Sequence, residues 1–89
     1  MALTDDTLIE YPCDFPVKAM GLAVHDIESI FIAIIQNHLP HQETFDIKRL
    51  ESSGGKYLSI TITLQAQNRE QLDATYQSLC DHENILMTL

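Results

Sequence analysis

The segment YLSITITLQA, residues 57–66, decides the fold. Its apolar side chains alternate with hydroxyl and amide side chains, which predicts a β-strand with one buried and one solvated face. The buried face consists of Leu58, Ile60, Ile62 and Leu64, and the solvated face of Tyr57, Ser59, Thr61, Thr63 and Gln65. A strand with one wet face is typical of an antiparallel sheet.

The preceding residues supply the first partner strand. Residues 43–53 contain a shorter strand, with Phe45 and Ile47 on one side and Asp46 and Lys48 on the other. The sequence SSGG at 52–55 predicts the turn between the two strands, because glycine tolerates a positive φ. The glycines before Lys56 are not a phosphate-binding loop, because that motif joins a strand to a helix.

A further strand is predicted at residues 15–21. Its buried face carries Phe15, Val17 and Ala19, and its other face carries Pro16, Lys18 and Met20. Pro16 should lie where no backbone N–H is needed, as should Pro12 at the start of the strand. Gly21 then permits a bend or the close approach of another element.

Two segments have the apolar spacing of amphipathic helices. The first, at about residues 25–38, begins near the acidic Asp26 and ends before Pro40. The second, at about residues 69–81, begins at Asn68 as the N-cap, with Gln71 placed as in a capping box. Their apolar stripes are Ile27, Ile30, Phe31, Ile34 and Ile35 in the first helix, and Leu72, Tyr76 and Leu79 in the second.

Residues 84–89 complete the chain as a last strand, with Ile85, Met87 and Leu89 expected on the buried face. The elements then follow the order β-α-β-β-α-β, and right-handed connections place both helices on one face of the sheet. We therefore predict an α+β fold, a ferredoxin-like sandwich whose four-stranded antiparallel sheet has strand order 4-1-3-2. It forms one domain over residues 11–89, preceded by a flexible acidic arm at residues 1–10.

Composition excludes several kinds of partner. The 89-residue chain has a net charge of −8 and only five Lys and Arg residues, which argues against binding a nucleic-acid backbone. The longest apolar run, residues 30–35, is too short to span a membrane, and the acidic first residues do not resemble a secretory signal. We expect a cytoplasmic protein with two reduced cysteines.

Several short motifs run nearly from end to end. They are LIEYP at 8–12, Phe15 with Lys18, Met20 and Gly21, then Gln36-x-His38-x-Pro40, SSxGxYxSxT at 52–61, Tyr76-x-x-Leu79 and Met87-x-Leu89. In these motifs the chain resembles the YbeD-like family of small, functionally uncharacterised bacterial proteins. The resemblance implies a ferredoxin-like domain similar to the ACT regulatory domains of amino-acid metabolism, and a gene context that often includes lipoate attachment. It supplies no catalytic residues, and this chain departs from it with His25 where a proline often opens the first helix.

No arrangement suited to catalysis or metal binding emerges from the sequence. His38 and His41 flank Pro40 and share no helix face, and the paired ligand spacing of a zinc site is missing. We interpret the four histidines as solvent-exposed loop residues. Cys13 and Cys80 have no neighbouring base that would activate them, so we interpret them as packing or edge residues. We therefore predict no enzymatic activity, no metal and no cofactor.

The uncovered face of the predicted sheet is the remaining candidate site. By alternation it shows Lys18, Met20, Asp46, Lys48, Tyr57, Ser59, Thr61, Thr63, Leu86 and Thr88. Met20, Tyr57 and Leu86 could join into an apolar contact patch, and a sheet edge offers a second route through strand pairing. A merely solvated face is an equally good interpretation. The candidate interaction residues are Lys18, Met20, Lys48, Tyr57, Thr61 and Leu86.

Two functions remain open. The first is a non-enzymatic regulatory or protein-interaction domain that binds a protein partner, or a second copy of itself, through the sheet face or a sheet edge. The second is an ACT-like sensor of an amino acid or carboxylate, in which backbone N–H groups of the loop at 21–26 meet the ligand. Asp26 in that loop would repel an anion, so the sensor is the weaker hypothesis.

Overall fold

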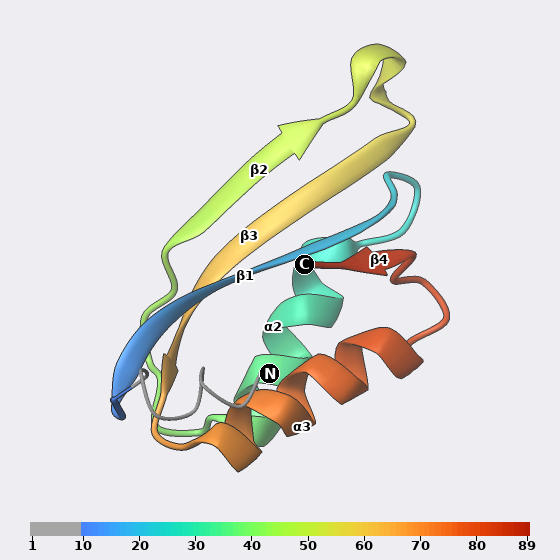
Figure 1. The fold of residues 1–89 in the computed structure, drawn as a ribbon. Coiled ribbons are helices and arrows are strands. Elements are labelled where there is room, and N and C mark those ends of the chain that lie inside the picture. The colour runs from blue at the N-terminus through green and yellow to red at the C-terminus, as the bar shows by residue number, and fades with distance from the viewer. Residues whose placement is uncertain (1–9) are drawn as a thin grey trace, which may run out of the picture.

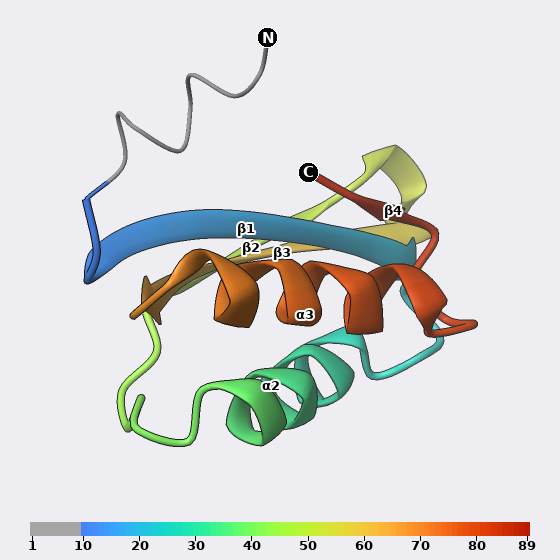
Figure 2. The same ribbon diagram turned by 60° about the horizontal axis from the view of Figure 1, so that its bottom comes forward.

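The computed structural model describes residues 10–89. Its elements are β1 (Cys13–Leu22), α2 (Ile27–His38), β2 (Ile47–Glu51), the short 3-10 turn η1 (Ser53–Gly55), β3 (Tyr57–Ala66), α3 (Arg69–Asp81) and β4 (Met87–Thr88). The strands form one antiparallel sheet in the order β2-β3-β1-β4, and both helices pack on one of its faces (Figures 1 and 2). The predicted ferredoxin-like fold and strand order are confirmed. Except for residue 10, the predicted arm lies outside the described residues.

The core lies between the sheet and the helices. Val17 of β1 lies opposite Ile62 of β3, and Ala19 lies opposite Ile60, and all four are fully buried. The helices add Ile27, Phe31 and Ile35 from α2 and Leu72 and Leu79 from α3. The predicted buried face of residues 57–66 is confirmed, although Leu58 near the hairpin end is only half-buried.

A side chain caps the start of each helix, as predicted for Asn68, while at the first helix Asp26 was expected only to meet the helix dipole. Asp26 accepts hydrogen bonds from the backbone N and the Oγ of Ser29, at 3.2 and 2.8 Å. Asn68 accepts a hydrogen bond of 2.8 Å from the backbone N of Gln71. The Oε1 of Gln71 accepts a 2.9 Å hydrogen bond from the backbone N–H of Gln67, whereas a capping box would use the N–H of Asn68. Both helices therefore begin where local sequence dictates.

Gly21 allows two other segments to approach β1 closely. A Cβ at this position would lie 2.4 Å from the carbonyl oxygen of Asn84 and 2.5 Å from Cδ1 of Ile27. The start of α2 and the loop before β4 therefore pack directly on the strand backbone.

None of the helices within residues 10–89 has the length and apolar character that a membrane span requires.

Pro16 occupies a backbone position that needs no donor, as predicted. Lys18 and Leu89 exchange two backbone hydrogen bonds of 3.0 and 2.8 Å, so the even-numbered residues of β1 point their backbone groups toward the β4 side. By the same alternation the backbone N of Pro16 points toward the β4 side of β1. Pro16 lies beyond the end of β4, and no strand within residues 10–89 pairs with β1 there. The missing N–H therefore breaks no sheet hydrogen bond.

The sequence assigned the faces of the last strand wrongly. Met87 lies opposite Met20 and so belongs to the uncovered face, whereas Thr88 lies opposite the buried Ala19 on the helix side. The Oγ1 of Thr88 is buried and has no hydrogen-bond partner among the described residues. Met87 was expected on the buried face and Thr88 on the open one, and both expectations are corrected.

A bulge explains this error. Ile85 is buried, as predicted, but Met87 and Leu89 no longer share its face. The backbone N of Leu86 donates a 2.8 Å hydrogen bond to the carbonyl of Met20, the residue that also lies opposite Met87. Two residues thus face one, which is the geometry of a β-bulge, and the alternation shifts by one position.

Candidate functional site

The candidate site is the face of the sheet turned away from the helices. Figure 2 shows α2 and α3 side by side beneath the strands, and none of the described elements covers the opposite face. An antiparallel sheet tolerates such exposure when its outer side chains are polar. Here one half of the face also carries exposed leucine and methionine side chains.

An apolar row crosses all four strands in the other half. Leu50 of β2, Ser59 of β3, Met20 of β1 and Met87 of β4 are successive cross-strand neighbours. Leu50 is 68% exposed and Met87 49% exposed. We call these four residues the apolar row. Three of its four side chains are apolar, although solvent reaches the whole row.

Basic side chains flank the apolar row. The next row along the strands contains Lys48, Thr61, Lys18 and the exposed Leu89. At the start of β3, the Nζ of Lys56 lies 5.4 Å from the ring centroid of Tyr57, a cation–π distance. Three of the five basic residues of the chain therefore gather on this half of the face, in a protein with a net charge of −8.

The other half of the face is polar and acidic. Thr63 lies opposite Pro16, and Gln65 lies opposite Asp14. Asp46 continues this half beside β3, where its carbonyl accepts a 3.3 Å hydrogen bond from the N of Thr63. The face thus changes along the strands from apolar and basic to polar and acidic.

The structure places most of the predicted interaction residues together. Lys18, Met20, Lys48, Tyr57 and Thr61 all lie on the uncovered face, in the apolar and basic half. Tyr57 lies opposite Leu22 and is therefore the diagonal neighbour of Met20.

Leu86 is 56% exposed but lies at the bulge before β4, so it adjoins Met20 without being part of the row. The sequence analysis missed Leu50, Met87 and Leu89. Leu50 continues the alternation of Asp46 and Lys48 and could have been found from it.

In the loop proposed for a small ligand, the backbone N–H groups of Ala23 and His25 already donate to the carbonyls of Lys56 and Leu22, at 2.8 and 3.0 Å. Asp26 already accepts the N–H of Ser29 at the start of α2. Hydrogen bonds from the Oγ and N of Ser29 lower the pKa of the Asp26 carboxyl, which favours its charged form. A bound carboxylate would therefore meet a negative charge at this helix start.

The histidines are less exposed than predicted. His38 is the last residue of α2 rather than a loop residue, and its Nε2 lies 2.6 Å from the Oγ of Ser78. His25 and His82 are also half-buried, and only His41 is exposed. Within residues 10–89 no three His, Cys, Asp or Glu side chains come together as a metal site would require. Cys13 is half-buried and Cys80 exposed, both as free thiols.

The contact between Ser78 and His38 lines an open groove of about 460 Å³ between the two helices. Ile30, Ala33 and Ile34 form its apolar wall. A serine nucleophile also needs donors for the developing oxyanion, and the backbone N–H groups beside Ser78 belong to α3 and its internal hydrogen bonds. The pair therefore links α2 to α3 across the groove.

Comparisons with known proteins agree along nearly the whole chain. A family model described as "Protein of unknown function (DUF493)" matches residues 6–89. A UPF0250 protein of Nitrosomonas europaea is 40% identical over 98% of this chain and 100% of its own length. A UPF0250 protein of a Janthinobacterium species is 42% identical over 94% of this chain and 92% of its own length.

Proposed function

The chain belongs to the DUF493 family, and we propose that it is a non-enzymatic interaction domain that binds a protein partner on the uncovered face of its sheet. Membership confirms the YbeD-like resemblance of its motifs. The observation that supports the proposal is the apolar row, Leu50, Ser59, Met20 and Met87, flanked by Lys18 and Lys48. A solvated face has no need of exposed leucine and methionine side chains in one line.

The composition of this half of the face defines the partner. Burying leucine and methionine side chains stabilises a complex by roughly 25 cal/mol per Å² of apolar area, before the costs of association. Methionine adapts to irregular surfaces, and Tyr57 offers a large rigid area. The lysines would orient a partner that carries carboxylates and would accelerate its binding. We therefore expect a partner surface with apolar side chains bordered by acidic ones.

The alternative function, an ACT-like sensor of a small carboxylate, has less support. Its helix start is already capped by Asp26. The interaction hypothesis needs no group that is already engaged, so we prefer it.

A capture experiment tests the proposal. An extract of the native host is passed over the immobilised wild-type protein and over the variants Met20→Asp and Tyr57→Ala. Any protein that is retained is purified, and its binding to the wild-type protein and to each variant is measured by titration. Gln36→Glu, an exposed change on α2 that adds the same charge as Met20→Asp, is the control.

We expect Met20→Asp to weaken binding at least tenfold and Gln36→Glu to leave it unchanged, with circular dichroism showing that all variants fold. Equal binding by every variant would show that this face is only solvated.

A further inference from the structure

Strand β2 has one unpaired edge. It lies at the end of the strand order, with β3 on one side only (Figure 1). The carbonyl of Asp46 accepts a hydrogen bond from Thr63, and the N–H of Ser52 donates one to Tyr57, so even-numbered residues here face β3. The backbone groups of the alternating residues Ile47, Arg49 and Glu51 therefore point away from the sheet.

This edge lacks two of the usual obstacles to pairing. Proteins protect exposed edges with proline, bulges, very short strands or charged side chains. The β2 ladder contains neither proline nor a bulge, and its pairing with β3 runs without interruption from Ile47 to Glu51. Its exposed charges, Lys48, Arg49 and Glu51, are of both signs, so a suitable strand could match them.

We propose that two copies of this chain pair antiparallel through β2, about a two-fold axis at Leu50, and join their four-stranded sheets into one. A two-fold axis makes each contact occur twice. The inference uses the backbone edge of β2 and does not depend on the proposed use of the sheet face.

The charges along β2 select this register. An axis at Arg49 would set two arginines opposite each other, an axis at Lys48 two lysines, and an axis at Glu51 two carboxylates. Like charges directly opposite destabilise a sheet. An axis at Ile47 avoids this, but half of its pairing would fall on residues 43–46, which precede the strand.

An axis at Leu50 gives complementary neighbours for the three residues that then pair within β2, namely Arg49, Leu50 and Glu51. Arg49 of one copy lies opposite Glu51 of the other, and the two Leu50 side chains face each other. Arg49 lies opposite the buried Ile60, and Glu51 opposite Leu58, so both point to the helix side of the sheet. Leu50 lies opposite Ser59 on the uncovered side and is 68% exposed in the single chain.

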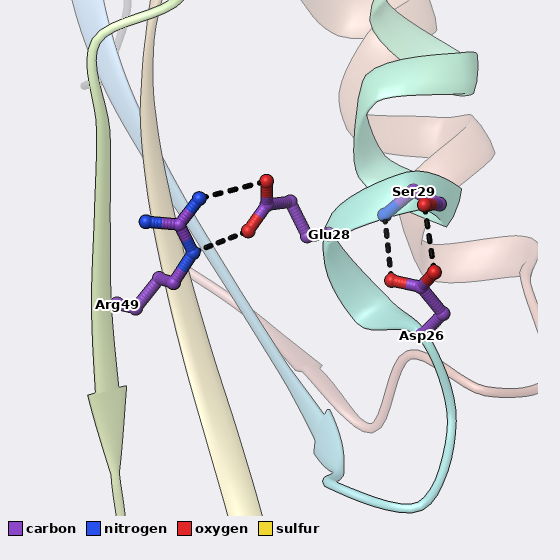
Figure 3. A network of polar contacts seen from close by, with 4 residues as sticks. All are labelled: Asp26, Glu28, Ser29 and Arg49. Carbon is purple, nitrogen blue, oxygen red and sulfur yellow. Dashed lines mark hydrogen bonds and ion pairs between the residues drawn. The ribbon is translucent and has the colours of Figure 1, made fainter.

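Arg49 is oriented for such a contact. Its Nε and Nη2 donate to the carboxylate of Glu28 on α2, which holds the guanidinium on the helix side of the strand (Figure 3). Its Nη1 has no partner among the described residues and can donate to Glu51 of the second copy. A side chain already ordered loses less conformational entropy on binding.

Disulfide trapping tests the register. In a background where Cys13 and Cys80 are replaced by serine, Leu50→Cys is compared with Lys48→Cys under mild oxidation. Across the proposed axis the two positions 50 form a non-hydrogen-bonded pair with Cβ atoms about 4.5–5.5 Å apart. The two positions 48 lie about 13 Å apart along the strands, beyond the reach of a disulfide. We expect a covalent dimer at least tenfold faster from Leu50→Cys.

Sedimentation of the unmodified chain tests the dimer itself. Glu51→Lys sets a lysine opposite Arg49 twice, so we expect the dimer dissociation constant to rise about tenfold. Glu70→Lys, the same charge change on α3, should leave it unchanged. Met20→Asp, which tests the sheet face, should also leave the dimer intact. A wild-type chain that stays monomeric at all concentrations, or equal trapping at positions 48 and 50, would overturn the proposal.

Discussion

The guanidinium of Arg49, on the edge strand β2, binds both oxygens of the Glu28 carboxylate in the first turn of α2 (Figure 3). This bidentate contact joins the edge of the sheet to the helix layer. The side chain of Arg49 is 56% exposed and that of Glu28 28% exposed, so solvent screens the pair. Its contribution to stability is therefore modest, and it also fixes the position of the guanidinium.

The pair makes stability depend on pH. Hydrogen bonding from Arg49 lowers the pKa of Glu28, and bonds from Ser29 lower the pKa of Asp26. A carboxyl whose pKa is lower in the folded state stabilises the fold above its unfolded pKa. That contribution is lost as the pH falls through the folded pKa. We therefore expect the free energy of unfolding to fall below about pH 4.

Urea denaturation at a series of pH values checks this expectation. Glu28→Gln should flatten the decline in the acid range, and Arg49→Ala should flatten it in the same way, because each removes the same bond. The double variant should flatten it no further than Glu28→Gln alone. An unaltered decline in all three would show that the pair does not couple to folding.

The two faces of β3 should differ sharply in their tolerance of substitution. Ile62 is fully buried, so Ile62→Ala should lower the free energy of unfolding by about 2–5 kcal/mol. Thr61 is its neighbour on the uncovered face, and Thr61→Ala should change that energy by less than about 0.5 kcal/mol. Equal costs in chemical denaturation would contradict the register of the sheet.

Gly21 should not tolerate a side chain. A Cβ at this position would lie 2.4 Å from the carbonyl of Asn84, a backbone atom that cannot easily move aside. Gly21→Ala should therefore lower the free energy of unfolding by about 1–3 kcal/mol. Gly55→Asn serves as the control: the glycine has a φ of 73° in open space, which asparagine accepts, so thermal unfolding should change little.

Thr88 offers a stabilising substitution. Its buried Oγ1 lacks a partner among residues 10–89, so Thr88→Val replaces an unsatisfied hydroxyl by a methyl group of similar shape. We expect the free energy of unfolding to stay constant or rise by about 1–2 kcal/mol. A loss of more than about 1 kcal/mol would show that the hydroxyl is bonded in solution.

Elements encoded by local patterns were predicted from the sequence. The alternation of residues 57–66 was enough for β3, and Asn68 with Gln71 was enough for the start of α3. The faces of β4 could not be predicted, because the bulge arises where Leu86 meets the carbonyl of Met20, a residue far away in sequence.

The roles of two further residues could not be predicted from the sequence, because each depends on a contact with a distant segment. Gln42 is buried and bonds the backbone of β3 at Thr63 and Gln65, and nothing near it in the sequence indicates this. The same limit explains why His38, which meets Ser78 across the helix layer, was taken for a loop residue. The site face was predicted wherever simple alternation held, and Leu50 could have been added by extending it.

Pro16 bears on how large an assembly the sheet can build. A subunit with two receptive edges adds neighbours without end and forms a filament, whereas one with a single receptive edge stops when that edge is filled. On the β4 side of β1, beyond the end of β4, Pro16 withholds the N–H that an incoming strand would need. Pro16 therefore makes this stretch of β1 a poor site for adding a strand, whereas two-fold pairing through β2 occupies that edge in both copies and ends at two chains.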